Sequence, residues 1–244
     1  MSYARDERTA LAALLDETGP DAPTLCEGWR TRDLAAHLVL RDRRPDAAAG
    51  ILGGPLASYT RRVQEALAGR TPYPQLVQQI RTGPPAISFY RLPGMDERLN
   101  LIEFFTHHED VRRAAGGWEP RDLDADMADA LWQRLQLARP VFRRVPVGVE
   151  LVRDDLPDDP GGPGGPGAMG PAGLAPDMRS VPPRQHSGRR QVRITARAKT
   201  PVVTVTGHPA ELTLWVLGRT TAARVRLDGG QQEVRRLTES RWGA

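Results

Sequence analysis

The spacing of apolar residues changes near Pro146, and this change limits the possible folds more than any other feature of the sequence. Before it, apolar side chains recur every three or four residues, as in the segment 6–17, which is the period of an amphipathic helix. After it, apolar and polar residues alternate, as in the segments 147–152 and 191–197, which is the period of a strand. We therefore expect a helical first part followed by a part that contains a sheet.

Gly and Pro divide the first 140 residues into helical segments with short loops between them. The breaks lie at Gly19-Pro20, Gly53-Gly54-Pro55 and Gly83-Pro84-Pro85, since Gly and Pro disfavour the interior of a helix. Thr31 is the predicted N-cap of the second helix, and Pro45 is predicted to kink or end that helix. The helices are predicted at 6–17, from 31 to about 45, and at 56–68, 74–81, 96–116 and 124–139. Such a run of helices with short loops indicates an antiparallel bundle.

The second part combines strands with two helices. Strands are predicted over 147–152, 191–197, 202–206 and 222–227. A helix is predicted over 210–217, because Pro209 stands just inside its start and Gly218 directly after its end, where these two residue types are favoured. A closing helix is predicted over 231–241. The second part is therefore expected to be a small α+β domain.

A low-complexity insert separates the first two predicted strands. Residues 157–176 contain 6 Pro and 7 Gly in 20 positions. A segment of this composition cannot bury enough apolar surface to offset the entropy lost on ordering it. We therefore predict a disordered loop at about 155–188, with His186 at its edge as a residue without a functional role.

The composition excludes several classes of protein. The single cysteine, Cys26, cannot form an internal disulfide, which is typical of a reducing compartment. No apolar run is long enough to span a bilayer, and the first residues contain no apolar signal-peptide core. We expect a cytoplasmic protein with no membrane partner.

Charge is distributed unevenly along the chain. Residues 1–120 hold 15 Arg and 16 Asp or Glu, a net charge of −1, whereas residues 179–244 hold 13 Arg or Lys and 4 Asp or Glu, a net charge of +9. A basic module of this kind can meet nucleic acid or an anionic small molecule, or can simply present a solvated basic face. Because the region lacks a zinc finger and aromatic–basic repeats, nucleic acid is not an expected partner.

Glu103 and His107 stand four residues apart on one predicted helix, and His37 stands alone on an earlier one. Positions i and i+4 project from the same face of a helix, so this carboxylate and imidazole can bind one divalent ion. A third ligand from another helix leaves a fourth coordination position open, as in catalytic zinc sites. Asp110 lies on the same face as Glu103, whereas His108 points about 140° away from it.

A second interpretation of this polar helix face requires no metal. Its acidic and histidine side chains can pair with some of the many arginines, and Asp110 can pair with Arg113 instead of orienting a ligand histidine. The metal interpretation gains weight because both segments lie on apolar, core-forming helices. An unpaired charge there would be costly unless an ion or a partner compensated it.

Three stretches of the chain resemble a known family. The segment Pro23-Thr-Leu-Cys-Glu-Gly-Trp-Arg-Thr-Arg-Asp-Leu-Ala-Ala-His-Leu38 resembles the signature of the mycothiol-dependent maleylpyruvate isomerase family, within the DinB-like superfamily. So does Glu103-x-x-x-His107 with the Glu-Asp-Val-Arg that follows it. The tail Gly207-His-Pro-Ala-Glu-Leu-Thr-Leu-Trp-Val-Leu-Gly-Arg219 is similar to the family's C-terminal domain. The segment from Phe105 to Ala114 is closer to a branch of metal-binding proteins of actinobacterial type.

The resemblance implies a specific fold. This is an all-α N-terminal DinB-like four-helix bundle over residues 1–142, followed by a small α+β, sterol-carrier-protein-like domain over residues 143–244 that contains the Pro/Gly-rich insert.

The resemblance also implies roles for individual residues. The divalent metal, most often zinc, would be held by His37, Glu103 and His107, with Asp110 in the second shell. Arg219 would either bind an anionic substrate or interact as an arginine at a helix C-terminus with the helix dipole. Cys26 could serve as a nucleophile, but no distinct base is evident, and the resemblance makes it a structural loop residue. Independently of the resemblance, Trp29 is expected to pack at a loop–helix junction, and His208 is expected at the cap of the helix that follows it.

The function implied by the resemblance is a mycothiol-dependent transferase or isomerase. In this reaction class a metal lowers the pKa of a low-molecular-weight thiol, and the thiolate attacks an electrophilic small molecule, which can be anionic. The alternative is a module that binds a metal or a small molecule without catalysis. The metal, the substrate, the thiol and the oligomeric state stay open at this point.

Overall fold

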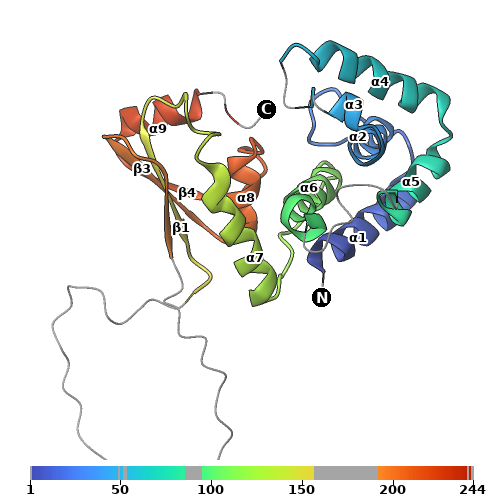
Figure 1. Ribbon diagram of the computed structural model, residues 1–244. Coiled ribbons are helices and arrows are strands. Elements are labelled where there is room, and N and C mark those ends of the chain that lie inside the picture. Colours follow the sequence, from blue (N-terminus) through green and yellow to red (C-terminus); the bar gives the residue numbers. More distant parts are fainter. Residues whose placement is uncertain are drawn as a thin grey trace, which may run out of the picture.

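The computed structural model describes residues 2–48, 50–51, 54–85, 95–156, 192–240 and 242, with residues 95–99 as backbone alone. Nearly all of the predicted disordered insert, including His186, lies outside the described residues. The chain forms a helical part and a part with a sheet, which stand on the right and left of Figure 1. This succession confirms the prediction of a helical first part and a mixed second part.

The helical part follows the breaks predicted from Gly and Pro. Pro45 ends one helix and begins the next, as expected for a residue that lacks a backbone donor. The helices are α1 (Tyr3–Thr18), α2 (Thr31–Arg43), α3 (Pro45–Ala48), α4 (Ala57–Arg70), α5 (Tyr73–Thr82), α6 (Met95–Arg112) and α7 (Ala125–Leu135), and a short 3-10 helix (Gln136–Ala138) follows α7.

The start of α2 differs from the prediction by one residue. Arg30, and not Thr31, occupies the N-cap position. The Asp33 carboxylate accepts a hydrogen bond from the Arg30 backbone N–H at 3.0 Å. The Thr31 hydroxyl instead donates to the carbonyl of Gly19, which ties the start of α2 to the end of α1. The Thr31 side chain, which was predicted to cap α2, therefore makes a tertiary contact with the end of α1 instead.

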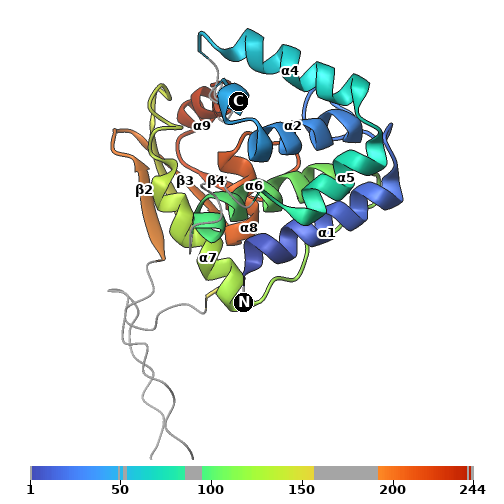
Figure 2. The same ribbon diagram turned by 45° about the vertical axis from the view of Figure 1, so that its right-hand side comes forward.

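Helices α1, α2, α5 and α6 enclose an apolar core in the helical part. Leu11, Leu15, Leu34, Leu38 and Phe104 are almost completely buried in it. α6 packs along α1, while α2 packs against α4 and α5. α4 lies over α2 at the top of Figure 2. This packing fits a helical bundle, and the specific DinB-like four-helix architecture remains a prediction.

The second part contains a four-stranded sheet in the order β2-β1-β3-β4. β1 pairs with β3 in parallel, and the two outer pairs are antiparallel. The strands are β1 (Gly148–Arg153), β2 (Arg193–Arg197), β3 (Val202–Gly207) and β4 (Arg226–Asp228), and the helices are α8 (Pro209–Val216) and α9 (Gln231–Thr238). The small α+β prediction is thus confirmed, whereas the sterol-carrier-like identity remains a prediction.

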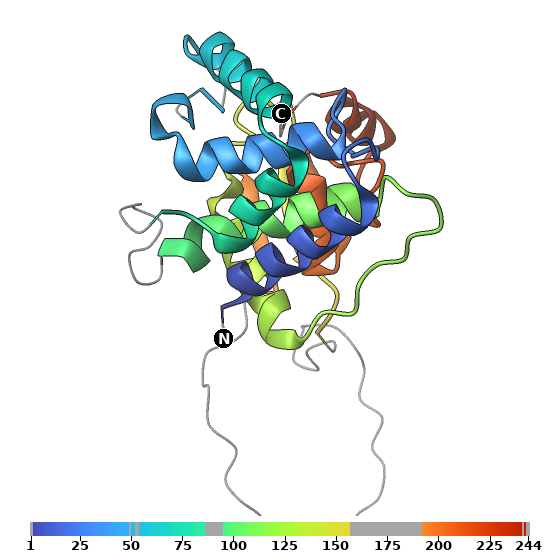
Figure 3. The same cartoon turned by 90° about the vertical axis from the view of Figure 1, so that its right-hand side faces the viewer.

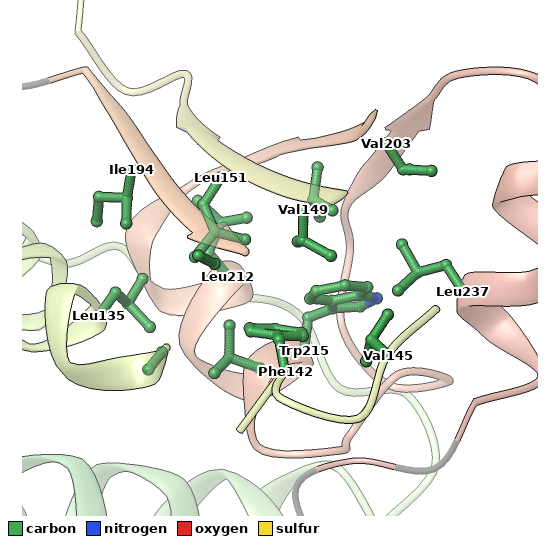
Figure 4. Close-up of a cluster of buried hydrophobic side chains, with 14 of the residues drawn as sticks. Leu135, Phe142, Val145, Val149, Leu151, Ile194, Val203, Leu212, Trp215 and Leu237 are labelled. Carbon is green, nitrogen blue, oxygen red and sulfur yellow. The ribbon is translucent and has the colours of Figure 1, made fainter. Parts of the chain in front are cut away.

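One face of this sheet is covered by a second apolar core. Val149 and Leu151 of β1 point toward Leu212 and Trp215 of α8, as Figure 4 shows. The rings of Phe142 and Trp215 stack with centroids 5.8 Å apart. α7 also contributes to this core through Trp132 and Leu135. The helix that precedes the first strand is therefore packed against the sheet.

The last two predicted elements are shorter than expected. β4 begins at Arg226 and not at 222, because Ala222 and Ala223 form a turn whose backbone N–H groups donate to the carbonyl of Arg219. α9 ends at Thr238 and not at 241. Both differences lie at the end of a strand or helix, where contacts with neighbouring residues decide the boundary.

A third apolar cluster joins the two parts. It combines Leu101 and Phe105 of α6 with Met127 and Leu131 of α7 and Leu214 of α8. In Figure 3 the helical part stands in front of the sheet, and in Figure 1 α6 lies on the side of the helical part that faces the sheet. α6, which carries Glu103 and His107, is thereby held from both sides. No helix in the described ranges has the length and apolar character needed to cross a membrane.

Candidate metal centre

Three side chains from two helices converge on one point. Glu103 and His107 project from one face of α6, and His37 reaches the same point from α2. One Glu103 oxygen, Oε1, lies 3.2 Å from Nε2 of His37 and 3.4 Å from Nε2 of His107. The rings of His37 and His107 meet edge to face, with centroids 5.3 Å apart. One ligand atom from each residue lies within 4.8 Å of the others.

The three residues differ in their access to solvent. Both histidine side chains are nearly buried, whereas the Glu103 side chain stays 24% exposed. Burial raises the pKa of Glu103, but hydrogen bonds with His107 and His37 outweigh it and hold that pKa well below its usual range. Burial lowers the pKa of His107, but hydrogen bonds with Asp110, Cys26 and Glu103 raise it well above its usual range. The centre thus concentrates charge in an apolar surrounding.

Asp110 fixes which nitrogen of His107 carries a proton. Its Oδ2 lies 2.8 Å from Nδ1 of His107. An ionised carboxylate can only accept, so Nδ1 must donate. In the neutral ring, Nε2 then presents its lone pair toward Glu103 and His37. This is the tautomer that a metal ligand needs, with the second nitrogen held by a carboxylate.

Arg219 reaches this carboxylate from the second part of the chain. Its Nε and Nη2 donate to the two oxygens of Asp110 at 2.9 and 2.7 Å. Burial raises the pKa of Asp110, but the bonds with His107 and Arg219 outweigh it and keep that pKa far below its usual range. The guanidinium also donates to the carbonyl of Leu217 at 2.6 Å. Most donors of Arg219 therefore serve contacts within the protein.

Cys26 lies much closer to the centre than the sequence analysis expected. Its Sγ lies 3.2 Å from Oδ2 of Asp110, 3.5 Å from Nη2 of Arg219 and 4.0 Å from Nδ1 of His107. With His107 and Asp110 it forms a second group whose ligand atoms could hold an ion. The Arg219 guanidinium already compensates that carboxylate, and its positive charge opposes a cation there.

Arg41 is a contributor that the sequence analysis missed. It follows His37 by four residues on α2, and its Nε lies 3.5 Å from Oε1 of Glu103. It also donates to the side-chain amide oxygen of Asn100, on α6. Its spacing of four residues from His37 indicates that both side chains share one face of α2. The sequence holds 34 basic residues, however, and this spacing alone does not show which of them reaches the site.

Four further residues have other partners. His108 faces away from the centre, and its Nδ1 lies 2.9 Å from Oε2 of Glu7. Arg113 pairs with Glu109 and Glu211, so the alternative pairing of Asp110 with Arg113 is wrong. His208 caps α8, where its Nδ1 accepts from the Ala210 N–H at 3.2 Å, as expected. Trp29 lies beside the centre, with its ring centroid 5.1 Å from that of His37.

Trp29 lines two clefts that also contain residues of the centre or its surroundings. The larger, of about 790 Å³, is lined by Cys26, Trp29 and Arg219, and by residues of the second part up to Trp242. The smaller, of about 450 Å³, lies between α2 and α4 and is lined by Trp29 and His37. We refer to them as the Arg219 cleft and the α2–α4 cleft.

The three converging residues fit a divalent metal. Two imidazole nitrogens and one carboxylate oxygen form a common donor set of catalytic zinc sites, which keep one further position open. Nε2 of His107 and Oε1 of Glu103 face each other at 3.4 Å, and the raised pKa of His107 favours a proton on this nitrogen when no ion is bound. A divalent cation would replace that proton and bind both atoms. The partial exposure of Glu103 leaves access for a ligand.

One protein-family model matches the chain. Its description is mycothiol maleylpyruvate isomerase N-terminal domain, and it covers residues 2–141. No curated protein and no solved structure matches the chain significantly. The matched range holds the complete set of converging residues, whereas Arg219 lies outside it.

Proposed function

The chain belongs to the mycothiol maleylpyruvate isomerase N-terminal domain family, since the match covers more than half of its 244 residues, and on this premise we propose that it binds a divalent metal and activates a thiol. The metal ligands in this proposal are His37, Glu103 and His107. The observation that carries it is their convergence within 4.8 Å from two helices. The cosubstrate is mycothiol, and the metal is zinc, whose preferred donors match these three.

A bound metal would lower the pKa of the thiol, so that the thiolate exists at neutral pH. The protein's own groups prepare that step. Asp110 keeps the proton of His107 on Nδ1, which leaves Nε2 as the ligand atom. Arg219 holds Asp110 in place through two hydrogen bonds. Glu103, which stays partly exposed, marks the side from which the thiol enters.

The proposed reaction is an isomerisation or a transfer. In both, the thiolate attacks an electrophilic carbon of a small molecule. The isomerase then eliminates the thiol after rotation about the former double bond, whereas the transferase releases the adduct. We assign Arg219 to an anionic group of this substrate, because it lines the Arg219 cleft. Asp110 compensates its charge, so we expect this contact to orient the substrate more than to attract it.

The first test is the metal content of the purified protein, measured by mass spectrometry. We expect about one zinc per chain in the wild type and none in His37→Ala or His107→Ala. His208→Ala is the matched control, because this histidine caps α8 away from the centre and its loss should leave the metal in place. A wild type that takes up no metal when zinc is supplied would overturn the assignment.

The second test separates the enzyme from the binding module. Zinc-loaded protein is assayed for consumption of mycothiol with conjugated, anionic electrophiles. Turnover that is lost in His107→Ala supports the thiol-dependent reaction. Metal binding without turnover of any such substrate supports the alternative, a module that binds metal or a small molecule without catalysis.

A further inference from the structure

The α2–α4 cleft carries polar side chains that the metal centre does not use. α2 contributes Asp33 and His37, which are four residues apart and share one face. α4 contributes Arg61, Gln64 and Glu65, which likewise share one face of their helix. The cleft therefore runs from a proposed metal ligand to a polar wall on the opposite helix.

The side chains of this polar wall are free to bind a ligand. Within the described ranges, no hydrogen bond or ion pair engages Arg61, Gln64 or Glu65. Asp33 uses one carboxylate oxygen for the start of α2 and keeps the other available. Most other charged groups near the centre are paired, as Arg219 with Asp110 shows. This cleft therefore combines a proposed metal ligand with donors and acceptors that have no partner in the described residues.

The start of α4 is packed closely against Gly50, which follows α3. A Cβ atom at this position would lie 2.2 Å from Oγ1 of Thr60 and 2.5 Å from the carbonyl oxygen of Leu56. The Thr60 hydroxyl donates to the carbonyl of Ala47 across the same contact. These contacts join α4 to α3, and both helices also pack against α2, so the polar wall is held beside His37.

The chemistry of the lining indicates the class of ligand. Arg61 and Gln64 provide donors, while Glu65, Asp33 and the Gln64 carbonyl provide acceptors. One arginine faces two carboxylates, so the cleft does not attract a strongly anionic group. Trp29 at one end adds an aromatic surface that can pack on C–H groups while the polar groups bind hydroxyls. These features suit a neutral ligand rich in hydroxyl groups.

We propose that the α2–α4 cleft binds the hydroxyl-rich, sugar-like part of the thiol cosubstrate, with Arg61, Gln64 and Glu65 as its specificity-determining residues. This inference rests on the proposed thiol-dependent function. His37 lines this cleft but is absent from the described lining of the Arg219 cleft, so a thiol held here has its sulfur on the metal side. The electrophile then approaches from the Arg219 cleft, which Trp29 also lines.

The test compares two thiols on zinc-loaded protein by titration calorimetry. Mycothiol carries the sugar-like part, whereas N-acetylcysteine presents a similar thiol without it. In the triple variant Arg61→Ala, Gln64→Ala, Glu65→Ala, we expect mycothiol to bind at least about tenfold more weakly, since hydrogen bonds to charged groups are lost. The affinity for N-acetylcysteine should not change, and the zinc content should stay that of the wild type.

Arg62→Ala is the matched control, because Arg62 is an exposed neighbour on α4 outside the lining of the cleft. Its affinity for mycothiol should equal that of the wild type. Equal mycothiol affinity in the triple variant and the wild type would overturn the subsite while leaving the proposed function intact. A zinc-loaded wild type that binds neither thiol would overturn the proposed function, and the subsite with it.

Discussion

Two faces of α6 carry clusters of charged side chains, and the clusters are built differently. One face presents Glu103 and His107 to α2. The other presents Glu109 and Arg113 to α1 and to the second part of the chain. Both clusters are largely shielded from water, so each must compensate its charges within the protein or through a bound ion.

The cluster around Glu109 compensates itself. Arg113 donates from Nε to Glu109 at 2.6 Å and from Nη1 and Nη2 to the two oxygens of Glu211 at 2.9 and 2.7 Å. Arg121 bridges Glu109 and Glu7. Every oxygen of these carboxylates receives at least one N–H group. We call these five residues the interdomain network, because they connect α1 and α6 to α8.

The cluster around Glu103 gathers its partners on a single carboxylate oxygen. One nitrogen each of His37, His107 and Arg41 lies close to Oε1 of Glu103. Among the described residues, no hydrogen bond reaches the second oxygen, Oε2. A self-compensating cluster stabilises a fold, whereas a convergent and partly open one is suited to bind an ion. One helix thus carries a self-compensating cluster and the proposed metal centre.

The largest effect is expected from breaking the interdomain network. Arg113→Ala leaves Glu109 and Glu211 buried without their shared partner, which should lower the free energy of unfolding by about 3–5 kcal/mol. Urea denaturation measures this loss. Zinc content in the folded variant should match that of the wild type, because Arg113 contacts none of the proposed ligands. A change below about 1 kcal/mol would contradict the structural role given to the network.

The next effect comes from the metal centre. Zinc at a hundred times its dissociation constant should stabilise the wild type by about 2.7 kcal/mol, through binding to the folded state alone. His107→Ala should lose this increment, and Arg113→Ala should keep it. The measurement is urea denaturation with and without zinc. Equal stabilisation of His107→Ala and the wild type would show that zinc binds elsewhere.

A smaller effect, dependent on pH, is expected at Glu7. Burial raises the pKa of Glu7, but bonds with His108 and Arg121 outweigh it and bring that pKa below its ordinary value of 4.5. The ionised carboxylate therefore adds stability above that value, which is lost as the pH falls through the lowered pKa. Glu7→Gln should cost about 1–3 kcal/mol at pH 7.

The pH profile checks this assignment. The difference between the wild type and Glu7→Gln should shrink as the pH falls below 4.5, because the wild-type carboxyl group then becomes neutral as well. Unfolding curves at several pH values down to the acid limit of the fold measure it. A difference that stays constant with pH would mean that the substitution acts through packing and not through charge.

The smallest effect is expected at the rim of the network. Arg224 and Glu119 form an ion pair at 2.9 Å, but their side chains are 54% and 77% exposed. Solvent screens such a pair, so Glu119→Ala should change the free energy of unfolding by no more than about 0.5 kcal/mol. The same urea denaturation applies. If Glu119→Ala lowered the free energy of unfolding as much as Arg113→Ala, solvent exposure would not explain the difference expected between the two ion pairs.

Sequence analysis predicted most of the helices because their apolar spacing and Gly or Pro breaks are local signals. It placed β1 and β3 within about a residue of their observed bounds for the same reason. It failed at the start of α2, where the Thr31 hydroxyl bonds to Gly19 instead of capping. It also failed at β4, where residues from 222 onward turn to meet Arg113 through the Ala222 carbonyl. In both places a distant partner outweighed the local preference.

At the candidate centre, too, some features follow from local sequence and others from tertiary contacts. The sequence by itself determined that Glu103 and His107 share a helix face, because helical geometry fixes the direction of side chains four residues apart. It also singled out His37 through its surrounding motif. Only the tertiary structure brought His37 to them across 66 positions, since the burial of α2 against its neighbours decides which faces meet.

The surroundings of that centre depend on the tertiary structure still more. Arg219 lies 193 positions from Cys26, yet both contact Asp110. Arg113 reaches Glu211 over 98 positions. No periodicity encodes such pairs, because they form only when the two parts pack together around α6. The sequence determined the ligand types and their local spacing, and the packing of the two parts decided which charges are compensated and which stay open to a ligand.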